Sequence, residues 1–247
     1  MAKIWAHRGA SAYAPENTIE AFKLAAEMGA DGVELDVHMS KDGKLVVIHD
    51  EKIDRTSNGT GYVKDMTVKE LKSYDFSAGK TGFKNIRIPT LREALNFLKP
   101  LNIDVNIEIK ADKVIYEGIC EDVIKTVDLV GVGDKVIYSS FNHYILMKMR
   151  EINPAVRIGL LYAGALFEPW VYAKQLKANA IHPNFAIPIN IKNTVAASHA
   201  NGIAVHAWTA DDPEIVAKLA AIEVDAIVTN RPDVAVRVNK GEIIYKN

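Results

Sequence analysis

Short apolar stretches alternate along the chain with segments whose apolar residues recur at helical spacing. The apolar stretches predict eight strands, at residues 4–7, 32–38, 104–110, 135–140, 157–162, 178–183, 203–208 and 225–229. The segments between them predict helices at residues 18–28, 90–98, 116–129, 144–152, 169–176, 191–200 and 213–221. Repeated strand-then-helix units indicate an α/β protein with a TIM (β/α)₈ barrel, and a doubly wound open sheet is the alternative.

Polar residues mark where several of these helices begin. Asn17 and Asn142 each precede a helical segment and are expected to be N-caps, because a short polar side chain can accept a hydrogen bond from a free backbone N–H. Asp212 is followed by a proline, which is favoured at the first position of a helix.

One interval is too long for a single strand-and-helix unit. Between His38 and Asp104 the chain contains a stretch, residues 54–89, that is rich in Gly, Ser, Thr, Lys and Asp. We therefore expect residues 1–247 to form a single TIM-barrel catalytic domain with a small insertion after the second strand, at about residues 51–89. Two interpretations of the insertion are open: a surface segment without a role in function, or a functional element that acts as a lid or determines specificity.

Composition narrows the class of protein. The 247 residues include 30 Lys and Arg and 31 Asp and Glu, so the chain has no excess of positive charge to neutralise the phosphates of a nucleic acid. No apolar run approaches the ~20 residues that span a bilayer, and the N-terminus lacks a signal-peptide core. We expect a cytoplasmic protein without stable membrane association. The single cysteine, Cys120, excludes an internal disulfide and is interpreted as a buried apolar residue.

Carboxylates occupy positions where a barrel strand is normally apolar. In residues 32–38, period-two alternation puts Glu34 and Asp36 on the face opposite the valines and leucine. In residues 104–110 the same alternation groups Glu108 with Lys110. Because helices cover the outside of a barrel, these side chains are expected to point inward.

Three converging carboxylates predict a metal site. Glu34, Asp36 and Glu108 supply only oxygen ligands. Buried carboxylates are costly unless they are paired or bound to a cation. Hard oxygen ligands favour Mg²⁺ or Ca²⁺ over a soft transition metal.

Two histidines are expected beside these carboxylates. His7 ends the first strand and is followed by Arg8, which places both at the barrel mouth where catalytic side chains lie. His49 follows from a hairpin: if Asp42 and Gly43 form a two-residue turn, His49 lies directly opposite Asp36.

These residue types suit cleavage of a phosphodiester. Two imidazoles can act as base and acid in one turnover. A divalent cation, Arg8 and Lys110 can neutralise the oxygens of a phosphoryl group. A glycosidase would need two carboxylates and no cluster of cations.

Nine blocks of sequence, in this order, resemble the glycerophosphodiester phosphodiesterase family. They are His7-Arg-Gly-Ala, Pro15-Glu-Asn-Thr18, Glu34-Leu-Asp36, His49-Asp50, Asp54-Arg-Thr-Ser-Asn-Gly-Thr-Gly61, Ile88-Pro-Thr-Leu91, Glu108-Ile-Lys110, Trp208-Thr209 and Ile227-Val-Thr-Asn-Arg-Pro-Asp233. The resemblance implies a TIM barrel with an insertion after the second strand. It also implies hydrolysis of glycerophosphodiesters, such as deacylated phospholipids, to sn-glycerol 3-phosphate and an alcohol.

The resemblance also implies residue roles. By matching position, His7 and His49 resemble the general acid–base pair of the family. The set that resembles the metal ligands is Glu34, Asp36 and Glu108, and the set that resembles the phosphate contacts is Arg8 and Lys110. Glu16 and Asn17 resemble supporting residues of the first loop. Trp208 is interpreted either as a wall of the glycerol pocket or as simple core packing.

Two other functions remain open from the sequence. A phosphatidylinositol-type phospholipase C or a sphingomyelinase-D-like lyase also uses two histidines on a barrel, but the sequence shows no apolar interfacial helix. A barrel that only binds a phosphate or polyol would not need an acid–base pair. The partner expected here is a small glycerophosphodiester, and the sequence leaves a homo-oligomer open.

Overall fold

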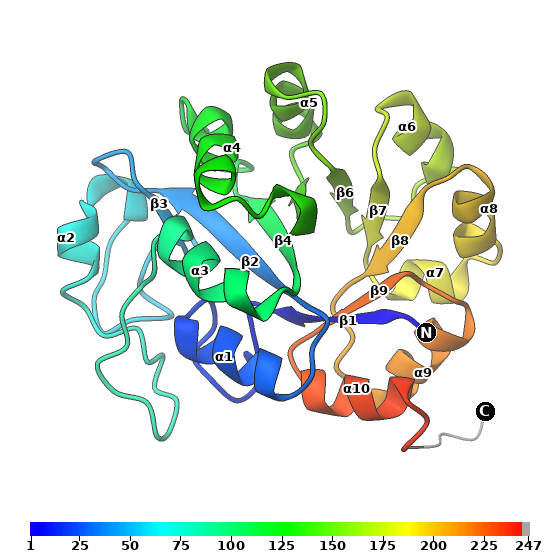
Figure 1. The fold of residues 1–247 in the computed structure, drawn as a ribbon, viewed down its shortest axis with the longest axis horizontal. Helices are drawn as coiled ribbons and strands as arrows, with labels where there is room; N and C mark the ends of the chain where they lie inside the picture. Colours follow the sequence, from blue (N-terminus) through cyan, green and yellow to red (C-terminus); the bar gives the residue numbers. More distant parts are fainter. Residues whose placement is uncertain (244–247) are drawn as a thin grey trace.

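The computed structural model describes residues 1–243, and within them eight parallel strands close into a barrel (Figure 1). The barrel closes because β1 (Lys3–His7) pairs with both β9 (Ala226–Thr229) and β2 (Gly32–Met39). The remaining barrel strands are β4 (Asp104–Ile109), β5 (Val136–Ser140), β6 (Ile158–Tyr162), β7 (Ala180–Pro183) and β8 (Ala204–Ala207). The closed barrel predicted from the sequence is confirmed, and the open sheet is excluded.

Helices surround the barrel (Figure 1). They are α1 (Ile19–Glu27), α3 (Leu91–Leu98), α4 (Ile119–Val130), α5 (His143–Ile152), α6 (Pro169–Gln175), α7 (Ala186–Asn190), α8 (Thr194–Ala200), α9 (Pro213–Ala221) and α10 (Pro232–Asn239). The sequence did not predict α7 or α10. Val234, Val236 and Val238 alternate as in a strand, and packing of α10 against β1 and α9 overrides that local preference.

The N-cap of α1 differs from the prediction. Thr18 is the cap, and its side chain accepts a hydrogen bond from the Ala21 N–H at 3.2 Å. Asn17 instead adopts a left-handed backbone conformation (φ 58°), and its amide donates to the buried carboxylate of Asp36 at 2.8 Å. The predicted cap Asn142 is confirmed, and Pro213 is the first residue of α9 as predicted, with Asp212 as its N-cap.

The insertion between the second strand and α3 has its own small apolar core. It follows β3 (Leu45–Val47) and contains a 3₁₀ turn (Val63–Asp65) and α2 (Val68–Leu71), at the left of Figure 1. The buried residues of this core are Val46, Ile48, Ile53, Val63, Leu71, Phe76, Ile86 and Ile88. The segment is therefore a packed unit, held to the barrel by β3.

The register of the β2–β3 hairpin was wrong in the sequence prediction by one residue. Val37 pairs with Val47, and Met39 pairs with Leu45. The turn has three residues, because Gly43 is left-handed (φ 68°) and favours this loop length. The backbone N–H of Ile48 consequently donates to the carbonyl of Asp36, so His49 is not the cross-strand neighbour of Asp36.

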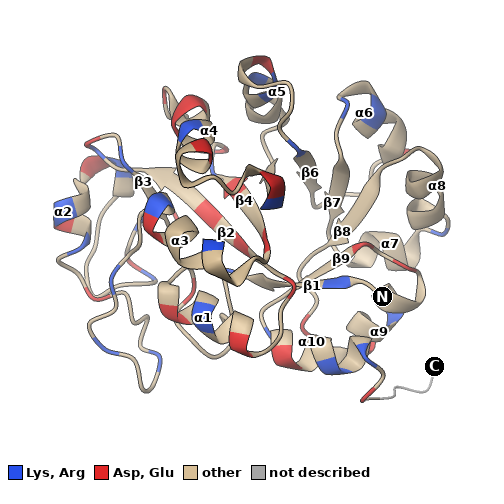
Figure 2. Cartoon of the chain, in the orientation of Figure 1, with Lys and Arg blue, Asp and Glu red and all other residues tan. Residues whose placement is uncertain are grey.

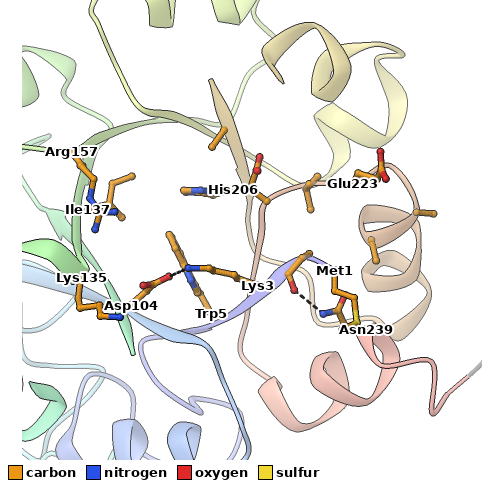
Figure 3. Close-up of a pocket in the computed structure, with 16 residues that line it drawn as sticks. Met1, Lys3, Trp5, Asp104, Lys135, Ile137, Arg157, His206, Glu223 and Asn239 are labelled. Carbon is orange, nitrogen blue, oxygen red and sulfur yellow. Dashed lines mark hydrogen bonds and ion pairs between the residues drawn. The ribbon is translucent and has the colours of Figure 1, made fainter. Parts of the chain in front are cut away.

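The opposite end of the barrel contains a separate cavity of about 750 Å³ (Figure 3). Lys3, Asp104 and Arg157, at or next to the first residues of their strands, line it together with Trp5 and His206. Lys3 forms an ion pair with Asp104 at 2.6 Å. In TIM-barrel enzymes this end contributes to stability, whereas catalytic residues lie at the carboxyl ends of the strands.

Cys120 is buried on α4, as the sequence predicted. Within residues 1–243, no helix has the length and apolar character needed to cross a membrane.

The turn after β1 generates a stability prediction. Gly9 is left-handed (φ +79°), and an added Cβ would lie 2.6 Å from the backbone of Ala21 in α1. Gly43 is also left-handed, but an added Cβ there meets no described residue within 4 Å. Gly43→Ala should lose about 1–2 kcal/mol of unfolding free energy through its backbone alone, and Gly9→Ala about 1–3 kcal/mol more through overpacking. Urea denaturation measures both, and equal losses would contradict the packing argument.

Candidate active site

A pocket opens at the carboxyl ends of the barrel strands and brings most of the predicted site residues together. Its lining consists of His7, Arg8, Glu34, His49, Asn106, Glu108, Lys110, Phe141, Leu161, His182, Trp208 and Val228. Asp36 is fully buried between Glu34 and Glu108, directly behind this lining.

The three predicted carboxylates form one buried cluster. Oxygen atoms of Glu34, Asp36 and Glu108 lie within 4.8 Å of one another. Asp36 and Glu108 are cross-strand partners of β2 and β4, strands that both show acidic bands in Figure 2. Among the described residues, Glu34 Oε1 and Asp36 Oδ1 are buried without a hydrogen-bond partner. Unsatisfied carboxylate oxygens aimed at one point fit a hard divalent cation.

The electrostatics of the cluster lead to the same conclusion. Burial, together with the negative charge of Asp36, raises the pKa of Glu108 to about 7. Burial and the charges of Asp36 and Glu108 raise the pKa of Glu34 well above its usual range. Burial would also raise the pKa of Asp36, but Lys110 and Arg8 outweigh it and lower that pKa. Arg8 and Lys110 therefore leave Glu34 and Glu108 with raised pKa values, and a bound divalent cation would favour the ionised form of both.

Arg8 and Lys110 flank the cluster on the pocket side. The backbone N–H of Arg8 donates to Glu34 Oε2 at 2.9 Å, and its guanidinium Nε lies 3.3 Å from Asp36 Oδ2. Lys110 Nζ lies 2.6 Å from Glu108 and 3.5 Å from Asp36. Both cations line the pocket, where they can contact the oxygens of a phosphoryl group.

A chain of hydrogen bonds determines the tautomer of His7. Asn230 donates from its amide nitrogen to Asp211 at 2.6 Å, so its amide oxygen faces His7 and accepts from Nδ1–H at 2.7 Å. His7 Nε2 therefore has the free lone pair, and it lies 3.9 Å from Glu34 Oε2. Burial, followed by the charge of Arg8, lowers the pKa of His7 to about 4. His7 is neutral at neutral pH and can accept a proton at Nε2.

His49 has a different partner. Its Nδ1 lies 2.6 Å from the carboxylate of Asp50, which accepts a hydrogen bond from Nδ1–H and orients the imidazole. Burial alone would raise the pKa of Asp50, but hydrogen bonds from Arg55 and His49 lower it to about 2. The backbone carbonyl of His49 accepts from His38 Nε2 at 3.0 Å, and His38 Nδ1 accepts from the Tyr116 hydroxyl at 2.8 Å. His49 thus lines the pocket through its own contacts, although the predicted cross-strand pairing is wrong.

One wall of the pocket is aromatic and apolar. Trp208 packs edge-on against Phe141 with ring centroids 5.5 Å apart, and its indole N–H donates to the His182 carbonyl at 2.7 Å. Gly159 leaves the space for His182, because an added Cβ would lie 2.1 Å from the imidazole Nε2. Trp208 therefore lines the pocket, and its contact with substrate stays a prediction.

Sequence reasoning missed the residues that orient the two histidines. Asp50 and Asn230 both lie in the blocks that resemble the family. Asp50 directly follows His49, and Asn230 directly follows a predicted strand, so both could have been named as candidate site residues from the sequence. Phe141 and Tyr116 lie in loops without a pattern that would single them out. The contact of His38 with the His49 carbonyl was also not predicted.

Known proteins share both the sequence and the fold. A sequence profile of the glycerophosphoryl diester phosphodiesterase family matches residues 7–234. A glycerophosphodiester phosphodiesterase of Caldanaerobacter subterraneus subsp. tengcongensis is 46% identical, with 96% of this chain and 97% of the relative covered. The crystal structure of the Agrobacterium tumefaciens enzyme of that name matches with a TM-score of 0.84 and 32% identity, covering 96% of this chain and 100% of the other.

A second solved structure was determined with a ligand. It is a phosphodiesterase of Oleispira antarctica in complex with the product sn-glycerol-3-phosphate, and it matches with a TM-score of 0.85 and 27% identity over 96% of both chains. The extent of the profile match and the identity to named relatives agree with the geometry of the pocket. This chain belongs to the glycerophosphoryl diester phosphodiesterase family.

Proposed function

We propose that this protein hydrolyses glycerophosphodiesters to sn-glycerol 3-phosphate and an alcohol. His7 and His49 are its acid–base pair, and Glu34, Asp36 and Glu108 hold one Mg²⁺ or Ca²⁺. The observation that carries the proposal is that one pocket brings His7 and His49 next to the buried carboxylate cluster. His7 is bonded to an amide oxygen and His49 to a carboxylate. The product-bound Oleispira antarctica relative supports the substrate class.

The two imidazoles divide the proton transfers. His7 takes the proton of the attacking oxygen at Nε2, because its Nδ1 proton is held by Asn230. His49, whose Nδ1 is bonded to Asp50, donates a proton from Nε2 to the departing alkoxide. Arg8 and Lys110 bind and orient the phosphoryl oxygens. The cation, when bound, supplies further positive charge and lowers the pKa of a coordinated hydroxyl.

Relatives named glycerophosphodiester phosphodiesterase favour this hydrolysis over a phospholipase C or sphingomyelinase-D-like lyase. We further propose that residues 1–247 act as one catalytic domain, with the inserted segment supporting the site through Arg55. The Arg55 guanidinium lies 2.7 Å from Asp50 and 2.6 Å from Glu16. A cytoplasmic location stays a prediction of the sequence.

Removal of the cation should abolish turnover of glycerophosphocholine, and Mg²⁺ or Ca²⁺ should restore it. Glu34→Gln should lower kcat by about 10²-fold or more, since the cation contributes several kcal/mol of charge stabilisation. The variant should not unfold at lower temperature, because it removes one of three like charges. Glu214→Gln, an exposed carboxylate on α9, is the matched control. Full activity in a verified metal-free preparation would refute the metal assignment.

The leaving group should distinguish the two histidines. His7→Ala and His49→Ala should each lower the rate on glycerophosphocholine by roughly 10²–10⁴-fold. An activated p-nitrophenyl ester of glycerophosphate needs no general acid, so it should rescue His49→Ala and leave His7→Ala slow. His199→Ala, at a histidine of α8 paired with Asp225, should behave as the unsubstituted protein. Rescue of His7→Ala alone would reverse the assignment, and rescue of neither would reject it.

A further inference from the structure

The backbone of His49 is held in the pocket by a side chain of another strand. β3 ends before Ile48, whose N–H donates to the Asp36 carbonyl at 3.0 Å. In the part of the chain that the structure describes, the His49 backbone then makes a single hydrogen bond. Its carbonyl accepts from His38 Nε2 at 3.0 Å. The place of His49 in the pocket therefore depends on His38 and not on a continued strand ladder.

The imidazole of His38 is fixed through both of its nitrogens. His38 lies on β2, two residues beyond Asp36, and is 1% exposed. A carbonyl oxygen can only accept, so Nε2 carries the proton of the bond to His49. In the neutral ring Nδ1 then has the lone pair, and it accepts from the Tyr116 hydroxyl at 2.8 Å. Neither nitrogen is left to bind a cation or to exchange a proton with a substrate.

Tyr116 restrains His38 from a separate part of the barrel. It belongs to the loop between β4 and α4, and its ring packs edge-on against the imidazole with centroids 5.7 Å apart. The same loop is joined to the inserted segment by an ion pair between Lys113 and Glu51 at 3.2 Å. Neither His38 nor Tyr116 lines the pocket. Their contacts therefore reach the pocket through His49.

A general acid works only from the correct position. Its donor atom must come within hydrogen-bond distance of the leaving oxygen, and an error of about 1 Å can lower the rate by about 10²-fold. Asp50 restrains the ring of His49 through Nδ1, and His38 restrains its backbone. These two restraints act on different atoms, so neither replaces the other.

We propose that His38 is a positioning residue for His49. Its Nε2–H holds the His49 carbonyl so that the His49 imidazole faces the departing oxygen. The Tyr116 hydroxyl keeps His38 in the tautomer and orientation that donate this bond. The inference rests on the proposed function, because it takes His49 as the general acid.

Two substitutions at position 38 separate the donor from the rest of the side chain. His38→Gln places an amide N–H near the position of Nε2 and keeps a donor for the His49 carbonyl. His38→Asn places its amide near the position of Nδ1 and loses that donor. On glycerophosphocholine, His38→Asn should lower kcat by about 10- to 100-fold with a much smaller change in KM. His38→Gln should keep most of the rate.

The leaving group distinguishes positioning from a general structural defect. A p-nitrophenyl ester of glycerophosphate needs no general acid, so His38→Asn should lose little rate on it, as expected for His49→Ala. A disturbance that spreads through β2 to Asp36 and the carboxylate cluster would lower both rates equally. Equal losses on the two esters, or equal losses in His38→Asn and His38→Gln, would overturn the proposal.

His143 provides a matched control. Its Nε2 bonds to the Leu161 carbonyl at 2.9 Å, and its Nδ1 lies 3.1 Å from the Tyr172 hydroxyl, so the bonding pattern is that of His38. Any effect of His143→Asn should be the same on both esters. A loss confined to glycerophosphocholine in this variant would contradict a specific role of His38.

A milder substitution keeps the test decisive if His38→Asn does not fold. Tyr116→Phe removes one hydroxyl and leaves the ring that packs on His38. It should lower kcat on glycerophosphocholine by about 2- to 10-fold, the value of one hydrogen bond, and leave the activated ester unaffected. Equal rates of Tyr116→Phe and the unsubstituted protein on glycerophosphocholine would overturn the part assigned to Tyr116.

A measurement without turnover separates this inference from the proposed function. NMR of isotope-labelled histidine nitrogens should place the proton of His38 on Nε2, and a proton on Nδ1 alone would overturn the proposal. The His49 signals should shift more in His38→Asn than in His38→Gln. If they do but neither ester is hydrolysed, the proposed function is wrong and the positioning of His49 stands. If glycerophosphocholine is hydrolysed equally by both variants, the positioning is wrong and the proposed function stands.

Discussion

Three carboxylates that face one point in a buried site are the constraint on which the rest of the pocket depends. Their mutual repulsion and burial are opposed by Arg8, Lys110 and the amide of Asn17. These groups hold the oxygens in place but leave two of them without a partner within the described residues. Carboxylate oxygens that lack a partner in a buried site fit a divalent cation.

The chemical difference between the two histidines comes from their neighbours. His7 faces an amide oxygen, which is neutral and accepts one proton, whereas His49 faces the carboxylate of Asp50. Both groups accept a hydrogen bond from Nδ1–H, but only the carboxylate carries a charge. Two identical side chains in one pocket therefore differ in their surroundings because of one neighbouring residue each.

The sequence alone predicted the eight barrel strands and the carboxylate cluster, since period-two alternation places Glu34 and Asp36 on one face regardless of distant contacts. It mispredicted the β2–β3 register because a single left-handed glycine adds one residue to the turn. The contact of Asn17 with Asp36 could not be predicted for another reason. It joins two segments that are adjacent only after the barrel has closed, and no local sequence pattern indicates that adjacency.

The inserted segment connects the carboxylate cluster with His49 through a series of ion pairs. Glu16 and Asp50 are both acidic, and Arg55 of the insertion lies between them. Without Arg55, Glu16 would keep only its ion pair with Arg8, and Asp50 only its contact with His49. The resulting series of alternating charges runs from the carboxylate cluster to His49: Asp36 to Arg8 at 3.3 Å, Arg8 to Glu16 at 2.9 Å, Glu16 to Arg55 at 2.6 Å, Arg55 to Asp50 at 2.7 Å and Asp50 to His49 at 2.6 Å. A barrel that supplies the cluster and an insertion that supplies one arginine thus share one electrostatic network. A change at Arg55 can therefore alter the surroundings of His49 although Arg55 does not line the pocket.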